Sequence, residues 1–247
     1  MNGLIRSTLL IFCLGTVACA SQQGEEAQTE DAQTILERCF QFHDPNNEWP
    51  DWAGTYVSME PRLQTPDRKS KVQIRTDGSF FDMERGYGKD TLHWTIKEGQ
   101  YLTFVNGQLV QDTATMRLHR LSQERADGYH NYYRTKLGLP MSLKGRYELK
   151  QGNVEPVSWQ GASVYRLELE IADAPFSTAW ELFVDSKNYQ LLGYGFAPTE
   201  EESEYLVLDQ LMDMGQMKWP RMRHWYSREA DEYLGSDIIL TASPMHD

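Results

Sequence analysis

The six histidines of this 247-residue chain are its first candidates for chemistry, because imidazole titrates near neutral pH and can act as acid, base or metal ligand. They show no paired spacing of the kind that binds a metal on a helix, and the sequence has no Gly-x-Ser-x-Gly, His-Glu-x-x-His or Cys-x-x-Cys motif. We therefore predict no metal site, no cofactor and no catalytic residue. The histidines are His43, His93, His119, His130, His224 and His246.

His43 and Asp44 place an imidazole beside a carboxylate in the sequence. Neighbouring residues of a helix do not face one another, and Asp before Pro45 is typical of a turn. A catalytic histidine needs a partner oriented across space. A hydrolase that uses His43 or His130 with a carboxylate is therefore the last of three functional alternatives.

Cys19 is a candidate for covalent modification, because it ends the segment TVAC. Small residues followed by Cys resemble a bacterial lipobox, in which the Cys becomes the lipidated N-terminus, although Thr stands here where Leu is usual. Arg6 and the apolar run over residues 9–18 are typical of a secretory signal peptide, and the run is shorter than the about 20 residues that span a bilayer. We predict a signal peptide over residues 1–18 and lipidation of Cys19, with cleavage after Ala20 as the alternative.

The segment after Cys19 is predicted to be a tether. Residues 20–34 lack aromatic and branched aliphatic side chains, so they cannot bury enough surface to fold. We expect a flexible acidic tether over residues 19–30 and a single domain over residues 31–247. In that case the protein is bound to a membrane through the lipid anchor, and we expect it in the cell envelope, anchored in the outer membrane. Cleavage after Ala20 instead predicts a secreted or periplasmic soluble protein.

Composition limits the partners and the means of stabilisation. A net charge of −12 and the lack of any Lys and Arg cluster in the sequence argue against a nucleic-acid partner. Cys39 is left without a disulfide partner once Cys13 leaves with the signal peptide and Cys19 is acylated, so we expect a buried thiol. The domain, expected to be a monomer, must be stabilised by its core, for which 13 Tyr, 9 Phe and 7 Trp supply the apolar surface.

Two segments have helical periodicity. The first, residues 31–43, begins at Asp31 as a cap and is stopped by Pro45. The second, residues 122–137, is ended by Gly138. Their apolar stripes are Ile35, Leu36, Cys39, Phe40 and His43 in the first, and Ala126, Tyr129, Tyr133 and Leu137 in the second.

Most of the remaining chain alternates with a period of two, which predicts strands. Asp77-Gly78, Glu98-Gly99 and Asn106-Gly107 separate several of them and are strong hairpin signals. We predict an α+β fold that is mostly antiparallel β, with a large curved sheet, or half-barrel, wrapped around one or two helices. The predicted strands are residues 56–59, 72–74, 80–83, 92–96, 101–105, 164–171, 180–184, 191–196, 205–208, 217–226 and 238–240.

Aromatic side chains are the candidates for ligand contact. The group of aromatic side chains on the second helix, which includes His130, more often forms core than a binding site, and the pattern favours core. If the interior is open, the tyrosine rings of this helix and three tryptophans would instead line a ligand site. The possible ligand-lining residues are Tyr129, Tyr132, Tyr133, Trp180, Trp219 and Trp225.

Two sets of segments carry a family resemblance. WELFVDSKNYQLLGYGF (residues 180–196) and residues 205–226, with Gly215 and Pro220 as punctuation, resemble the C-terminal half of the LolA/LppX-like lipoprotein carriers, which are half-barrels. FHDP, NYYRTKLGLPMSL and WYSREADEYLGSD resemble a family of uncharacterised bacterial envelope lipoproteins, a domain of unknown function. These matches touch most of residues 33–240. In the carriers, helices cover a concave apolar sheet that shelters acyl chains, so the resemblance implies that architecture by analogy of fold.

Three functions remain open. The first is a non-catalytic envelope lipoprotein that binds a lipid or another hydrophobic ligand between sheet and helices, which predicts an open apolar cavity. The second is a structural or accessory lipoprotein that docks another envelope protein, which predicts a filled core and an exposed apolar patch. The third is the hydrolase described above, which predicts a histidine and a carboxylate meeting in a cleft.

Overall fold

The computed structural model describes residues 29–63, 67–175, 177–197 and 203–245. The predicted signal peptide and Cys19 lie outside this part of the chain, as do His246 and all but the end of the predicted tether. No helix of the described residues is long and apolar enough to cross a membrane.

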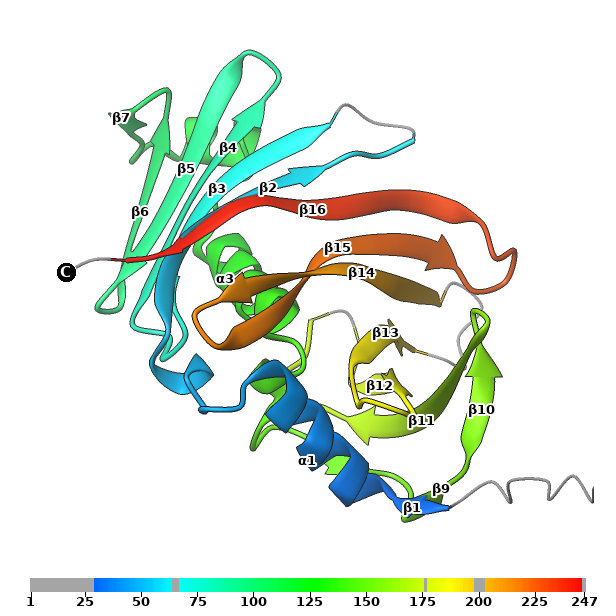
Figure 1. The fold of residues 1–247 in the computed structure, drawn as a ribbon. Coiled ribbons are helices and arrows are strands. Elements are labelled where there is room, and N and C mark those ends of the chain that lie inside the picture. The colour runs from blue at the N-terminus through cyan, green and yellow to red at the C-terminus, as the bar shows by residue number, and fades with distance from the viewer. Residues whose placement is uncertain (1–28, 64–66, 176, 198–202, 246–247) are drawn as a thin grey trace, which may run out of the picture.

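One antiparallel sheet of 14 strands dominates the structure. Its order is β10-β11-β12-β13-β14-β15-β16-β2-β3-β4-β5-β6-β7, with β8 paired to β11, while β1 pairs with β9 separately. Figure 1 shows this sheet curving around helix α3, so the predicted α+β half-barrel is confirmed. The strands are β1 (Glu30–Asp31), β2 (Ala53–Glu60), β3 (Arg68–Arg75), β4 (Phe80–Tyr87), β5 (Asp90–Lys97), β6 (Gln100–Val105), β7 (Gln108–Leu109), β8 (Glu148–Leu149), β9 (Asn153–Val154), β10 (Pro156–Trp159), β11 (Ala162–Glu170), β12 (Ala179–Asp185), β13 (Leu191–Phe196), β14 (Glu204–Met214), β15 (Met217–Ser227) and β16 (Tyr233–Pro244).

Tight hairpin turns join the strands β3 to β7. The tips of the last two hairpins carry Glu98-Gly99 and Asn106-Gly107, and all four residues have positive φ, between 51° and 77°. Such turns match the right-handed twist of the flanking strands, and glycine reaches positive φ without a steric penalty. The hairpins predicted from these dipeptides are confirmed.

Two long helices pack against the concave side of the sheet. Helix α1 (Ala32–His43) begins at Asp31, whose carboxylate accepts the Thr34 N–H at 2.9 Å. Helix α3 (Gln123–Gly138) begins after Ser122, whose hydroxyl accepts the Arg125 N–H. Both predicted helices are confirmed to within one residue at each end. The structure adds three short elements: α2 (Thr113–Leu118), η1 (Trp49–Asp51) and η2 (Met141–Leu143).

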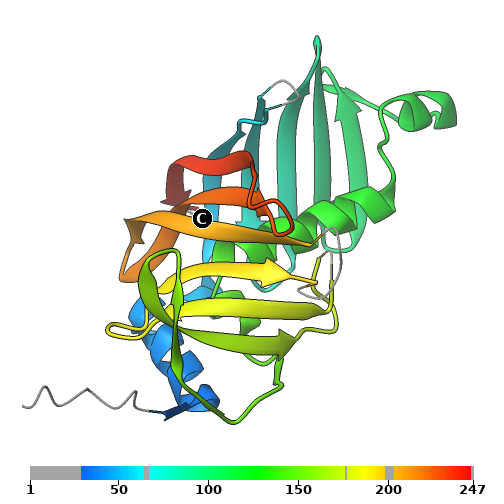
Figure 2. The same cartoon turned by 90° about the vertical axis from the view of Figure 1, so that its right-hand side faces the viewer.

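The helices divide the hydrophobic core into two clusters. Helix α1 packs Ile35, Leu36 and Cys39 against strands β11 to β14, whereas α3 packs Tyr133 and Leu137 against strands β2 to β5. Figure 2 shows α3 lying across the concave face of the sheet. Cys39 is fully buried and free, as predicted, and burial raises its pKa.

The interior also contains charged side chains, which the expected apolar concave surface did not include. Burying a charge is costly unless it is paired and hydrogen-bonded, so these residues must contact one another. Two of them, Glu60 and Arg85, line a cavity beside α3, and Asp237 bonds to the lining residues Arg62 and Trp225. The buried charged residues of this group are Glu60, Arg85, Lys136, Arg223 and Asp237.

Candidate functional site: a cavity between helix α3 and the sheet

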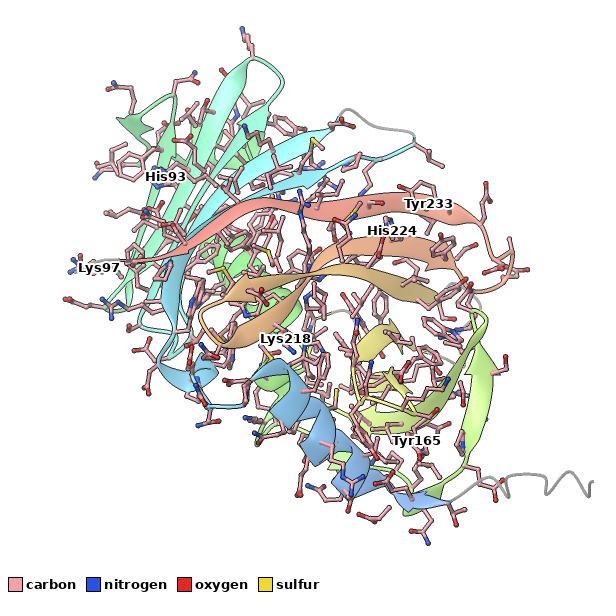
Figure 3. All side chains as sticks on the ribbon, in the orientation of Figure 1. His93, Lys97, Tyr165, Lys218, His224 and Tyr233 are labelled. Atoms are coloured by element: carbon pink, nitrogen blue, oxygen red, sulfur yellow. The ribbon has the colours of Figure 1, made fainter. Side chains whose placement is uncertain are left out.

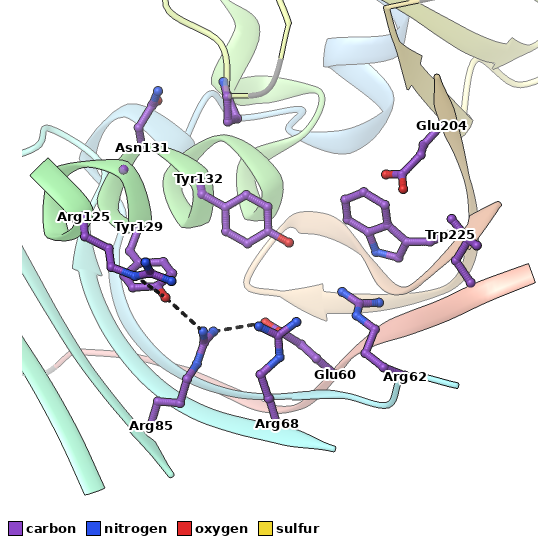
Figure 4. A pocket seen from close by; sticks show the side chains of 13 residues that line it. Glu60, Arg62, Arg68, Arg85, Arg125, Tyr129, Asn131, Tyr132, Glu204 and Trp225 are labelled. Carbon is purple, nitrogen blue, oxygen red and sulfur yellow. Dashed lines mark hydrogen bonds and ion pairs between the residues drawn. The ribbon is translucent and has the colours of Figure 1, made fainter. Parts of the chain in front are cut away.

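A cavity of about 650 Å³ lies between α3 and the concave face of the sheet (Figure 4). This volume is within the range of about 300–1,000 Å³ that is typical of small-molecule sites. The wall combines aromatic rings with arginines. The aromatic group of α3 also contributes to the core, as its pattern favoured, with Tyr133 buried and Tyr129 and Tyr132 packed against the core. The lining residues are Glu60, Arg62, Arg68, Arg85, Arg125, Gly128, Tyr129, Asn131, Tyr132, Pro175, Glu204, Trp225 and Leu234.

The alternation of two strands directs charged side chains into this space. In β2 the buried positions are Gly54, Tyr56, Ser58 and Glu60, so the strand phase that buries Tyr56 also buries Glu60. In β4 the phase that buries Phe81 and Met83 buries Arg85 next. Successive side chains of a strand point to opposite faces, so Glu60 and Arg85 share the concave face with the core.

Glu60 is the centre of the first ionic group. Its carboxylate lies 3.4 Å from Arg85 Nη2 and 3.4 Å from Arg68 Nε, so two guanidinium groups share one carboxylate. The Tyr133 hydroxyl donates to Glu60 at 3.0 Å and also contacts Arg85. Arg85 Nε donates to the Ser70 hydroxyl at 2.8 Å. These bonds fix Arg85 in place at the wall.

Asp237, in β16, is the centre of the second ionic group. Its carboxylate accepts Trp225 Nε1 at 2.7 Å and pairs with Lys136 Nζ at 2.7 Å and Arg62 Nη2 at 3.1 Å. The Tyr132 hydroxyl lies 3.4 Å away. Burial alone would raise the pKa of Asp237, but Lys136 and Arg62 oppose it and hold that pKa below its usual value. Asp237 thus positions three lining side chains, those of Arg62, Tyr132 and Trp225.

The lining is basic although the chain is acidic. Four arginines and two glutamates give it a formal charge of +2, against −12 for the whole chain. Arg85 and Arg125 both lie over the Tyr129 ring, at 5.1 and 5.5 Å from its centroid, and Arg125 Nε donates to the Tyr129 hydroxyl at 3.2 Å. Burial raises the pKa of Glu204, although Arg62 opposes the rise.

Three of the six aromatic side chains singled out in the sequence line the cavity: Tyr129, Tyr132 and Trp225. Tyr133 lies behind the wall with its ring in the core. Trp180 is buried under α1, stacked on Tyr194 with 5.3 Å between ring centroids. Trp219 is buried against Trp49 and Trp52. Ligand contact by the three lining rings stays a prediction.

Among the described residues, the two histidines of the hydrolase alternative form no hydrogen bond or ion pair with a carboxylate. His43 Nδ1 donates to the Lys218 carbonyl at 2.6 Å, and His43 Nε2 accepts the Leu191 N–H at 3.0 Å. Both ring nitrogens are therefore occupied, and burial lowers the pKa of His43 to about 4. Asp44 instead accepts the N–H groups of Glu48 and Trp49, which is the turn role expected for it.

His130 stacks on Phe81, with 5.1 Å between ring centroids, and burial lowers its pKa to about 4. Its Nε2 has no hydrogen-bond partner among the residues that the structure describes. No group of three His, Cys, Asp or Glu side chains in the described ranges is arranged to hold a metal ion.

One histidine–carboxylate pair escaped the sequence analysis. His93, labelled in Figure 3, lies on β5. Its Nε2 is 2.6 Å from Asp82, and the Thr95 hydroxyl donates to the same carboxylate at 2.8 Å. The signal was the β4–β5 hairpin, in which Asp82 pairs with Thr95 and Glu84 with His93. The pair is outside the cavity lining, and the carboxylate and the hydroxyl both contact the same ring nitrogen, Nε2. A catalytic triad instead has the nucleophile and the orienting acid on opposite ring nitrogens.

Comparison with solved structures gives matches over most of the chain. A LolA superfamily protein from Nitrosomonas europaea has a TM-score of 0.53 at 13% identity, covering 88% of this chain and 94% of that one. A putative outer membrane lipoprotein-sorting protein domain from Vibrio parahaemolyticus (TM-score 0.46, 11% identity, 87% and 93% coverage) and a DUF1329 family protein from Desulfovibrio piger (0.48, 9%, 86% and 92%) also match. No curated protein matches the chain.

The sequence profile of one family covers nearly the whole chain. The family of unknown function DUF6503 matches residues 8–241. The predicted membership in a domain of unknown function and the predicted LolA-like half-barrel are both confirmed. The chain belongs to the DUF6503 family, and its fold is similar to that of the LolA superfamily.

Proposed function

We propose that this protein is a non-catalytic envelope lipoprotein that binds a hydrophobic ligand in the cavity between α3 and the sheet. The observation that carries the proposal is the open space of about 650 Å³ with Tyr129, Tyr132 and Trp225 in its wall. A docking protein with a filled core, the second alternative, would not need such a space. The fold similarity to a LolA superfamily protein supports the same choice as an analogy.

The positions of the histidines support a binding role over a catalytic one. His43 uses both ring nitrogens to hold the backbone of β13 and β15, and His130 stacks on a core ring. In the described part of the chain, neither lines the cavity and neither forms a hydrogen bond or ion pair with a carboxylate. A hydrolase would need a base within hydrogen-bond reach of bound substrate.

The N-terminal segment supports a location in the envelope. A signal peptide over residues 1–18, lipidation of Cys19 and a tether over residues 19–30 would hold the cavity close to a membrane surface. Fractionation of cells that produce the wild type or Cys19→Ala tests this part. We expect the wild type in the membrane fraction and the variant in the soluble fraction; equal membrane retention of both would refute the anchor.

Native mass spectrometry tests ligand binding directly. Residues 29–247 contain every described element and both core clusters, so this segment is suited to purification from a bacterial periplasm without detergent. We expect a bound lipid that a second lipid displaces. A protein that stays free of ligand after incubation with lipid extract would overturn the proposal.

Two glycine variants separate the cavity from other surfaces. Gly128 lies on α3 at the cavity, and a Cβ at this position would meet nothing within 4 Å, so Gly128→Trp can place an indole in the cavity without a backbone clash. Gly152 also has open space around it but lies outside the cavity lining. We expect Gly128→Trp to lose the ligand and Gly152→Trp to keep it.

A further inference from the structure

The cavity wall is charged where a site for a neutral tail alone would be apolar. We infer that the ligand is an anionic amphiphile, with its acidic headgroup on Arg68, Arg85 and Arg125 and its apolar tail along Tyr132, Trp225 and Leu234. This inference rests on the proposed function and names the class of ligand that the same cavity takes.

Three arginines from three different elements meet at one end of the cavity. Arg68 begins β3, Arg85 lies in β4, and Arg125 lies in the first turns of α3 (Figure 4). All three, together with Tyr129, also line a smaller hollow that adjoins the cavity. The three arginines therefore lie on the side of the cavity that borders this hollow. Arginine is suited to this position because its planar guanidinium binds carboxylate and phosphate groups through two parallel hydrogen bonds.

The positive charge at this end exceeds the negative charge that faces it. Glu60 is shared by Arg68 and Arg85, at 3.4 Å from each. Arg125 bonds to the Tyr129 hydroxyl and pairs with no carboxylate in the described part of the chain. Three guanidinium groups therefore face one carboxylate. A bound anion would relieve this repulsion, which is the electrostatic basis for a headgroup at this end.

The other end of the cavity suits an apolar tail. Arg62 lies there but is bonded to Asp237, and its guanidinium lies over the Trp225 ring, 5.5 Å from the centroid. The apolar part of the wall comes from the rings of Tyr132 and Trp225 with Leu234 and Pro175. Glu204 also lies at this end, where burial raises its pKa and Arg62 opposes the rise. A polar headgroup beside an aromatic wall is the arrangement of an amphiphile site.

Isothermal titration calorimetry with ligands that share one tail tests the inference. The protein is the segment of residues 29–247, and the probes are dodecyl phosphate, dodecanoate and neutral dodecyl maltoside. Inorganic phosphate, which has no tail, is the fourth probe. We expect both anionic probes to bind more tightly than the maltoside. Arg68→Gln and Arg125→Gln should each raise the Kd of dodecyl phosphate roughly tenfold, as expected for loss of a charged hydrogen bond. The maltoside Kd should change less than about twofold.

Two features make the variants interpretable. Arg68 is partly exposed and Arg125 is exposed, so replacing either side chain should leave folding intact. Arg85 is buried in a hydrogen-bond network, so we do not replace it. Lys187→Gln, on the exposed turn after β12, removes the same charge outside the cavity lining and should leave every Kd unchanged. An equal effect of Lys187→Gln would show that net charge alone acts, and would overturn the inference.

The outcomes separate this inference from the proposed function. Equal affinity for anionic and neutral probes, unaltered by the arginine variants, would overturn the headgroup assignment while leaving a hydrophobic site in place. Binding of inorganic phosphate as tight as that of dodecyl phosphate would also overturn it, because the tail would then contribute nothing. Failure of every tailed probe to bind the wild type would overturn the proposed function itself.

Discussion

Replacing Asp237 by Asn should destabilise the protein strongly, because this carboxylate is the partner of a buried ammonium group. The Asp237 side chain is 1% exposed and the Lys136 side chain 5% exposed, and their charged atoms lie 2.7 Å apart. Breaking a buried pair by removing one partner typically costs about 3–5 kcal/mol, since the other charge stays in a medium of low polarity. We expect Asp237→Asn to lower the free energy of unfolding by that amount.

The pH dependence of the variant gives a second readout. Burial lowers the pKa of Lys136 and Asp237 raises it, so without the carboxylate the Lys136 pKa should fall further. The unfolded chain then binds a proton that the folded variant does not, and stability should rise as pH increases between the folded and unfolded pKa values of this lysine. In the wild type, the stability from Asp237 is present above the unfolded carboxyl pKa and is lost as pH falls through its lowered folded pKa.

Urea unfolding of the wild type, Asp237→Asn and the double variant Lys136→Met with Asp237→Asn measures these effects. The Lys136 ammonium lies over the rings of Tyr132 and Tyr133, at 4.9 and 5.7 Å from their centroids, so Met has aromatic neighbours to contact there. We expect the double variant to regain about 2 kcal/mol or more relative to Asp237→Asn. A loss under about 1 kcal/mol in the single variant, or no recovery in the double variant, would refute this account of the pair.

Three further predictions concern single sites. Gly128→Ala should raise the free energy of unfolding by up to about 1 kcal/mol and Tm by about 2–4 °C, because glycine is unfavourable inside α3 and a Cβ there meets nothing; a lower Tm in a thermal scan would count against the placement of α3. The hydrogen bond that the His93 ring donates to Asp82 raises the pKa of His93. This pair should therefore stabilise the fold below the unfolded histidine pKa of about 6.5 and lose its effect as pH rises through the folded pKa. Asp82→Asn should remove that pH dependence. If an NMR titration gives the same His93 pKa in the wild type and in Asp82→Asn, the stabilising role of the pair is refuted. The Cys39 thiol should react with a thiol reagent only after urea unfolding, because it is buried and its pKa is raised; rapid labelling of the folded domain would contradict its burial.

Local chemistry explains why much of the fold was predictable. Asp31 and Ser122 cap helices, and Glu98-Gly99 and Asn106-Gly107 adopt the positive φ that two-residue hairpins require. Each of these signals acts within four residues, so it can be found without knowing what lies nearby in space. The short strands at the ends of the sheet, such as β7 and β10, have few residues and little alternation, so they were not predicted.

The basic lining of the cavity could not be found in this way. Arg62, Arg68, Arg85 and Arg125 are spread over more than sixty positions, and they line one cavity only because β2, β3 and β4 pair in register and α3 crosses them. A search for clusters of Lys and Arg along the sequence therefore found none. The usable signal was Arg85, a charged residue at the position where the alternation of Phe81 and Met83 calls for an apolar one.

The two buried carboxylates explain how the fold holds these cations. In the β16–β2 pair Ile238 faces Met59, so Asp237 and Glu60 follow at the next position of the same two strands. Like charges on neighbouring strands destabilise a sheet unless cations separate them. Lys136 and Arg62 bind Asp237, while Arg68 and Arg85 bind Glu60, so the carboxylates gather cations from α3 and from the sheet.

The cations of the cavity wall outnumber the carboxylates that hold them. The carboxylates position the cations, and Arg125 adds a further charge above Tyr129 that neither carboxylate pairs with. An apolar wall of the same volume would hold a tail without the cost of burying Glu60 and Asp237. The protein nevertheless buries both carboxylates. An anionic headgroup bound by Arg68, Arg85 and Arg125 would offset the free energy that this burial costs, because it adds negative charge where three guanidinium groups lie together.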